Sequence, residues 1–310
     1  EGSFVKLTLN QLREQLFEEL GVHIPAIRVR TGAPLAPSTW RLQIDETPVA
    51  QWTVPPAAAY AFVASTELES MGIAATPLTN PMSSAPLCSI AAGSRDAVTA
   101  LGAEIRSFAE VVSGCLKIAL RRRASEFLGV QEVQSALSAF EPTAPALVKE
   151  VLQKVPLPLL TDVLKKLVHE QVSIRNLRAI FGALVAPTTE GDSSQLAERC
   201  RQALARQISH QFAQQGPLFA YLIDPSVEEK MRTSGPGGSI DPSDATAIID
   251  SVRSAASNRR AVLLASPDIR RLLRRLLEGV LPDLAVLSFS ELDPSLQVRP
   301  VGRIMPAFGD

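Results

Sequence analysis

The spacing of apolar residues changes three times along this 310-residue chain, and each spacing predicts a different kind of structure. A first helix is predicted to end at Gly21, and alternating apolar residues at 27–30 and 40–45, with an apolar run at 59–64, then predict strands. Between 146 and 212 the spacing is helical throughout, and the last part of the chain is mixed again. This order of elements predicts an α+β fold of several subdomains.

The middle block is predicted to hold four helices joined by short connections. Glu141–Pro145 is a linker-like stop before the first helix, 146–154. Pro158 suits the first turn of the second helix, and Ser173 is predicted to cap the third helix, 174–185. The fourth helix runs from about Ser194 to residue 212. Four short-linked helices indicate a compact helical subdomain.

The last block contains a predicted β-α-β unit. After a helix over 243–256, Ala261–Ala265 is an apolar strand, 267–278 is a helix and Leu284–Phe289 is a second apolar strand. Two strands joined by a helix in this way are expected to pair in parallel.

Residues for catalysis, cofactors or metals are not predicted. The chain lacks the phosphate-loop, dinucleotide, nucleophile-elbow and zinc-protease motifs, and Ser234–Ser239 is interpreted as a glycine-rich turn. Its three histidines are far apart, and its three cysteines (88, 115 and 200) form no C-x-x-C pair. The cysteine count fits a reducing compartment. We therefore expect a protein that is not an enzyme and needs no cofactor.

Membrane insertion is not predicted for this chain. The longest uncharged stretch, 70–94, contains three prolines and so cannot form one hydrophobic helix. The first residue is Glu1 and no signal peptide follows it. We expect a soluble piece of a larger protein.

One basic cluster stands out on a predicted helix. Four arginines are predicted to share one side of helix 267–278, opposite a leucine-rich side: Arg270, Arg271, Arg274 and Arg275. A solvated helix face is the first interpretation of this side. A contact with an acidic protein partner or a neighbouring subunit is the second, and a nucleic-acid contact is the third.

A helix-turn-helix is the alternative interpretation of the middle block. Helix 158–170, a three-residue break and helix 174–185 would project three polar side chains outward: Arg175, Asn176 and Arg178. A DNA-binding regulator is therefore the alternative function. The break lacks the usual glycine, and Asp162 and Glu170 would repel phosphate. The net charge of −1 also disfavours a nucleic-acid partner.

Four segments resemble the cytoplasmic domain of the type III secretion export gate, the FHIPEP or LcrD-like family. They are Ala124–Leu137, Val155–Ile180, Arg201–His210, and Ser266–Leu276 continued by Leu281–Leu292. Ile24–Arg30 is similar to the first strand of the family. The chain departs from the family at Phe181–Pro187, where an acidic segment with a tryptophan is usual. The injectisome branch is favoured over the flagellar one.

The resemblance implies four subdomains. A small α/β subdomain would comprise 1–73 and 123–141, with an inserted subdomain at 74–122. A helical, winged-helix-like subdomain would follow at 142–221, and an α/β subdomain containing the β-α-β unit would occupy 222–310.

The resemblance also implies a function in protein secretion. Nine such domains would form a ring at the cytoplasmic face of the bacterial inner membrane, attached through an N-terminal membrane domain. The ring would receive chaperone–substrate complexes and gatekeeper proteins, order their export, and meet the secretion ATPase stalk and other inner-membrane export components. Arg175, Asn176 and Arg178 are then expected at a subunit contact. A subunit or cargo contact is expected for Arg270, Arg271, Arg274 and Arg275.

Overall fold

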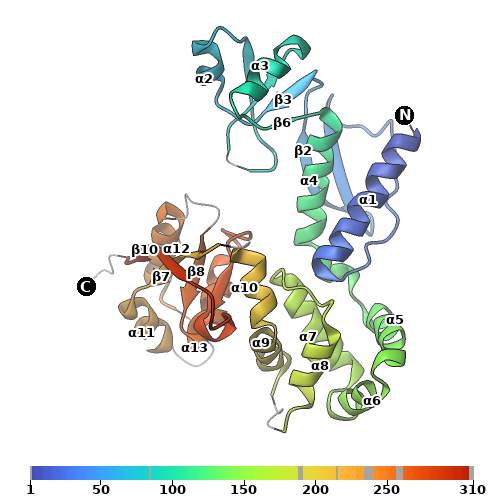
Figure 1. The fold of residues 1–310 in the computed structure, drawn as a ribbon, viewed down its shortest axis with the longest axis vertical. Coiled ribbons are helices and arrows are strands. Elements are labelled where there is room, and N and C mark those ends of the chain that lie inside the picture. Colours follow the sequence, from blue (N-terminus) through green and yellow to red (C-terminus); the bar gives the residue numbers. More distant parts are fainter. Residues whose placement is uncertain are drawn as a thin grey trace. The chain divides into compact units, whose positions relative to one another are not determined.

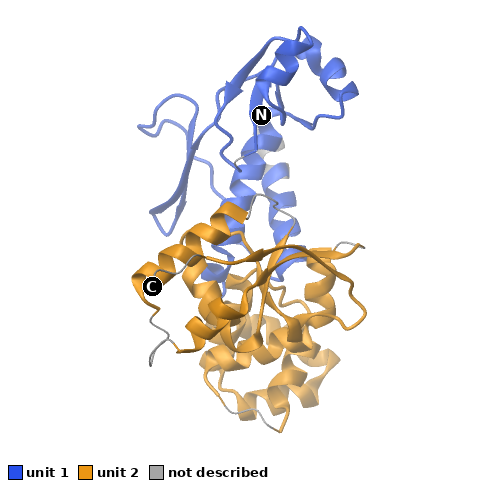
Figure 2. Cartoon of the chain, turned by 90° about the vertical axis from the view of Figure 1, so that its left-hand side faces the viewer, with its two compact units in different colours: residues 1–128 blue, residues 129–310 orange. Residues whose placement is uncertain are grey.

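The computed structural model describes residues 2–83, 85–187, 191–213, 216–233, 240–255 and 261–306, with side chains from residue 8 onward. The Ser234–Ser239 turn lies outside the described residues. The chain divides into two compact units, Glu1–Leu128 and Gly129–Asp310 (Figure 2).

The first unit begins with a helix packed beside a second one. Helix α1 (Gly2–Leu20) ends as predicted at Gly21, whose φ of 77° suits glycine and whose N–H donates to the Phe17 carbonyl at 2.7 Å. Helix α1 contacts α4 (Phe108–Arg122), and α4 contacts a hairpin of β1 (Thr39–Ile44) and β2 (Thr47–Thr53) (Figure 1).

The strand predicted at 27–30 is wrong. Residues 21–38 contain no strand, and the side chain of Val29 is 53% exposed. Alternation alone does not make a strand, because a strand needs a neighbour to accept its backbone hydrogen bonds. Ile24–Arg30, which is similar to the first strand of the family, therefore forms no strand in this structure.

A four-stranded antiparallel sheet forms the rest of the first unit. It is built from two β-α-β units with strand order β4-β5-β3-β6, which is the ferredoxin-like arrangement. The elements are β3 (Ala59–Ala61), α2 (Ser65–Ser70), β4 (Ala75–Leu78), β5 (Leu87–Ile90), α3 (Arg95–Ala100) and β6 (Ile105–Arg106). Among these strands, β3 corresponds to the strand predicted at 59–64. β4 contains a proline and β6 has two residues, so neither shows a strand pattern.

The two faces of this sheet are covered by different helices. Ala61 and Cys88 pack with Leu68 of α2 on one face. Tyr60 packs with Val111 of α4 on the other face. This alternation follows from the period of two in a strand.

Helices dominate the start of the second unit. They are α5 (Val130–Phe140), α6 (Pro145–Lys154), α7 (Leu157–His169), α8 (Leu177–Val185), α9 (Ser193–Ala203) and α10 (Ala205–Ala213). The predicted fourth helix is two helices, divided at Leu204. The predicted third helix begins three residues late, because Asn176 and not Ser173 caps it.

A four-stranded parallel sheet ends the chain, with strand order β10-β7-β8-β9. Its elements are β7 (Leu218–Ile223), α11 (Pro225–Thr233), α12 (Pro242–Ala255), β8 (Val262–Ala265), α13 (Pro267–Leu277), β9 (Val286–Ser288) and β10 (Val298–Ile304). The predicted β-α-β unit is confirmed as β8-α13-β9 with parallel pairing.

The strand pairings bear on the predicted subdomain borders. β3 precedes residue 73 but pairs with β5 and β6, which follow it. β7 runs across the border between 221 and 222. The four-subdomain division stays a prediction, and the pairings favour borders placed before β3 and before β7.

Candidate functional site

The arginine cluster of α13 is divided between the interior and the surface. Arg270 is completely buried and Arg274 is 8% exposed, whereas Arg271 and Arg275 lie on the outer side of the helix. The expected exposure is therefore wrong for Arg270 and Arg274. Sequence periodicity places these two opposite the leucines, but α9 and the residues around β9 cover that side of the helix.

Arg270 is held by two carboxylates from the helical part of the unit. Glu170, at the end of α7, accepts hydrogen bonds from both terminal nitrogens of the guanidinium, one at 3.0 Å. Glu198 of α9 accepts from Nε at 2.9 Å and from Nη2. Nη1 also donates to the carbonyl of Val286 in β9 at 3.3 Å. Arg270 thus joins three elements to α13.

A second arginine extends this cluster. Arg201 of α9 donates to Glu170 at 3.1 Å and to Glu291 at 2.6 Å, and both Arg201 and Glu291 are buried. Glu291 follows β9 and also accepts a hydrogen bond from Ser288 Oγ at 2.9 Å. We call these five side chains the ion cluster: Glu170, Glu198, Arg201, Arg270 and Glu291.

The pKa values of the carboxylates reflect their different partners. Burial would raise the pKa of Glu170, but the charge of Arg201 and the contacts of Arg270 outweigh it and lower this pKa to about 2. Burial raises the pKa of Glu198, although Arg270 opposes the shift. Burial disfavours the charge of Arg270, yet Glu170 and Glu198 hold its pKa above the usual value. Glu170 is therefore charged at neutral pH, and the low pKa of this carboxyl depends on Arg201 and Arg270.

Arg274 has a different role. Its two terminal nitrogens donate to the carbonyls of Leu284 and Pro282, each at 3.0 Å, so it fastens the segment between α13 and β9. Burial lowers the pKa of Arg274 below its usual value.

The polar residues predicted at the second contact lie at the start of α8. Arg175 and Arg178 are exposed, whereas Asn176 is half-buried and caps the helix by accepting a hydrogen bond from the Ala179 N–H at 3.1 Å. Asn176 therefore has a structural task. Seven residues separate α7 from α8, with Gln171 at a φ of 62°, so the predicted three-residue turn of a helix-turn-helix is absent here.

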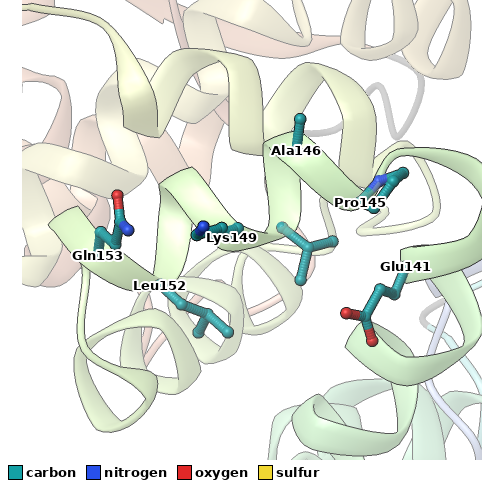
Figure 3. A pocket seen from close by; sticks show the side chains of 7 residues that line it. Glu141, Pro145, Ala146, Lys149, Leu152 and Gln153 are labelled. Carbon is teal, nitrogen blue, oxygen red and sulfur yellow. The ribbon is translucent and has the colours of Figure 1, made fainter.

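An open groove of about 600 Å³ follows α6. Its walls are apolar along the helix, with one acid at one end and one base in the middle (Figure 3). The lining residues are Glu141, Pro145, Ala146, Val148, Lys149, Leu152 and Gln153. The side chain of Leu152 is 37% exposed.

Candidate metal ligands and thiols were the chemical groups left open by the sequence. Within the described ranges, no group of three or more His, Cys, Asp and Glu side chains could hold a metal ion. All three cysteines are buried, and burial raises the pKa of Cys115 to about 11 and of Cys200 to about 12. No helix in the same ranges is long and apolar enough to cross a bilayer.

Sequence reasoning missed the carboxylates of the ion cluster. Glu291 lies inside Leu281–Leu292, one of the segments that resemble the family, but nothing in its local sequence indicated that it is buried. Glu170 was interpreted only as an acid opposing phosphate. No local pattern links Glu170 to Arg270, which is 100 residues away.

Comparison with known proteins gives a consistent result. The profile described as "FHIPEP family" matches residues 2–297. The invasion protein InvA of Salmonella typhimurium is 33% identical over 307 residues, covering 95% of this chain and 44% of InvA. The flagellar biosynthesis protein FlhA of Bacillus subtilis is 32% identical over 310 residues, covering 94% of this chain and 45% of FlhA. The chain thus spans less than half the length of these relatives.

Solved structures of similar chains share the fold. The CdsV protein of Chlamydia pneumoniae superposes with a TM-score of 0.87 at 30% identity, covering 96% of this chain and 90% of that chain. A structure of CdsV with a protein called CdsO matches with a TM-score of 0.84 at 30% identity, covering the same shares. A nonameric SctV-C from EPEC matches with a TM-score of 0.79 at 25% identity, covering 97% of this chain and 94% of that chain.

Proposed function

This chain belongs to the FHIPEP family. From that premise we propose that copies of it form the cytosolic docking ring of a type III secretion export gate. Similar chains carry the names of invasion and flagellar biosynthesis proteins, and the matched EPEC domain is a nonamer. InvA and FlhA are almost equally similar, so assignment to the injectisome branch is part of the proposal.

The ring is proposed to receive export substrates bound to their chaperones, together with gatekeeper proteins, and to order their export. The secretion ATPase stalk and other inner-membrane components are the remaining proposed partners. The CdsV–CdsO structure supports the idea that such a domain binds another protein. An N-terminal membrane domain would keep the ring at the cytoplasmic face of the inner membrane.

The exposed arginines are the proposed contact residues. Arg175 and Arg178 would meet a neighbouring subunit, with Asn176 holding the start of α8 in place. Arg271 and Arg275 would meet a subunit or a cargo, since Arg275 is exposed and the side chain of Arg271 is 40% exposed on the outer side of α13. Arg270 and Arg274 are no longer proposed for contact, because both are buried.

The absence of catalytic chemistry in the described ranges is compatible with a docking role. The DNA-binding alternative gains nothing from the comparisons, and the seven-residue connection between α7 and α8 removes its structural motif.

Calorimetric titration tests the docking function directly. A loaded chaperone–substrate complex, the free chaperone and a DNA duplex are each titrated into the protein. We expect binding of the loaded chaperone and no binding of DNA. Absence of chaperone binding both to the monomer and to an assembled ring would refute the proposal.

Charge reversal tests the proposed subunit contact. Arg175→Glu with Arg178→Glu should reduce ring assembly in sedimentation velocity, whereas Arg206→Glu, an exposed arginine of α10, serves as the matched control. Equal effects of the two changes would contradict the assignment.

A further inference from the structure

The segment between α1 and β1 has no partner strand. Residues 21–38 contain no helix or strand, although connections this long are uncommon in compact domains unless they have a function. Within them, Ile27–Arg30 alternates apolar and basic residues, which is a strand pattern. Ile27–Arg30 therefore has the pattern of a strand but has no neighbouring strand to pair with.

Its backbone is available for pairing. Among the described residues, no hydrogen bond engages the backbone of residues 25–32, and the side chains of Arg28, Val29 and Arg30 are exposed. Unpaired N–H and C=O groups in a row are a template for strand addition. Arg28 and Arg30 add two positive charges beside this row.

A complementary edge is present in the same unit. β1 and β2 form a two-stranded sheet, so each strand pairs on one side only. Within the described ranges, the backbone of residues 40–44 makes no hydrogen bond outside this pair. β1 contains no proline, whereas β2 contains Pro48, so the outer edge of β1 is the better acceptor of a third strand.

The charges beside β1 are opposite in sign to those of Arg28 and Arg30. The turn that ends β1 carries Asp45 and Glu46, both exposed. An isolated two-stranded hairpin is marginal in water, so a third strand would stabilise it. One chain therefore presents an unpaired basic strand segment and an open strand edge next to two acids.

A closed ring requires two different surfaces that fit each other, because each copy contacts its neighbours through opposite sides. We propose that residues 25–31 of one copy pair with the outer edge of β1 of the neighbouring copy, with Arg28 and Arg30 near that neighbour's Asp45 and Glu46. This inference rests on the proposed ring and names a contact that helps to build it.

Two substitutions at one position test the strand pairing. Val29→Pro removes the N–H that pairing needs, whereas Val29→Thr keeps the N–H and the β-branched shape. Because Val29 is exposed, both variants should unfold at the wild-type temperature as monomers. In mass photometry across a concentration series, Val29→Pro should weaken each interface about tenfold, as expected for a lost hydrogen bond with local distortion, and Val29→Thr should assemble like the wild type.

Charge reversal provides an independent readout. Arg28→Glu with Arg30→Glu should weaken assembly, Asp45→Lys with Glu46→Lys should weaken it too, and the combined variant should recover part of the loss. Hydrogen exchange should show residues 26–31 protected in the ring and unprotected in the monomer.

The outcomes separate the two proposals. If the wild type forms a ring and Val29→Pro assembles equally well, the strand contact is refuted and the ring stands. If residues 26–31 are already protected in the monomer, pairing occurs within one chain and the inference is refuted. If the wild type forms no ring at any concentration, both the ring and this contact are refuted for this chain.

Discussion

Substitution of Arg270 should reveal how strongly the ion cluster holds the second unit together. Arg270→Met keeps the length of the side chain and removes the charge, leaving Glu170 and Glu198 without their shared partner. Removing one member of a buried ion pair costs about 3–5 kcal/mol, because the remaining charge stays buried and uncompensated.

The size of the effect can be set against a neighbouring residue. Arg271 is the next residue on the same helix, its side chain is 40% exposed, and its nearest carboxylate, on Asp192, is 3.9 Å away. Arg271→Met should cost no more than about 1 kcal/mol. For a unit of this size, about 2–4 °C of midpoint shift accompanies each kcal/mol, so Arg270→Met should lower the midpoint by about 6–20 °C.

The pH dependence gives a second test. In the wild type, the lowered pKa of Glu170 adds stability above its unfolded pKa, and this stability is lost as pH falls through about 2. The raised pKa of Glu198 acts in the opposite direction, since its contribution is present at low pH and is lost as pH rises through the folded value. Without Arg270, the unpaired carboxylates should accept protons more readily, so the deficit of the variant should shrink as pH falls.

Thermal unfolding followed by circular dichroism between pH 5 and 8 measures the midpoint deficit of Arg270→Met and the change of this deficit with pH. The reasoning would be refuted by a midpoint for Arg270→Met equal to that of Arg271→Met, or by a deficit that is constant across this pH range.

Three further predictions concern other parts of the structure. Asn176→Ala should cost about 1 kcal/mol in denaturant unfolding, because the first turn of α8 loses its cap; an unchanged midpoint would contradict the assigned cap. Leu164→Ala should cost about 2–5 kcal/mol, since this side chain is 1% exposed in the helical core, and Leu152→Ala is its exposed control. A thiol reagent should modify the cysteines only upon unfolding, because all three are buried; rapid labelling of the native protein would argue against this packing.

Local patterns predicted the elements whose apolar face is one-sided. α6, α7 and α13 show helical spacing with a proline in the first turn, and all three were predicted within a few residues. α1 ends at the glycine where its end was predicted. β8 and β9 were predicted as a parallel pair because a helix joins them. These features follow from short stretches of chain, so sequence reasoning reaches them.

The errors arise where partners are distant. β7 and β10 were not predicted, although they pair with each other in parallel across about 80 residues of chain. An unbroken apolar run has no alternating pattern, and β7 (Leu218–Ile223) is such a run, although Phe219 in it is exposed. Ile27–Arg30 is the converse case, with alternation but no neighbour to pair with.

The amino-acid sequence by itself determined the helices with a one-sided apolar face, the β-α-β unit and the family. These depend on residues that are close together in the chain or on the segments that resemble the family. Only the tertiary structure decided which arginines of α13 are buried. Arg270 and Arg271 are adjacent and chemically identical, yet one meets Glu170 and Glu198 inside the protein and the other faces solvent. Burial of a charge depends on partners that the fold brings together, and Glu170 comes from 100 residues away.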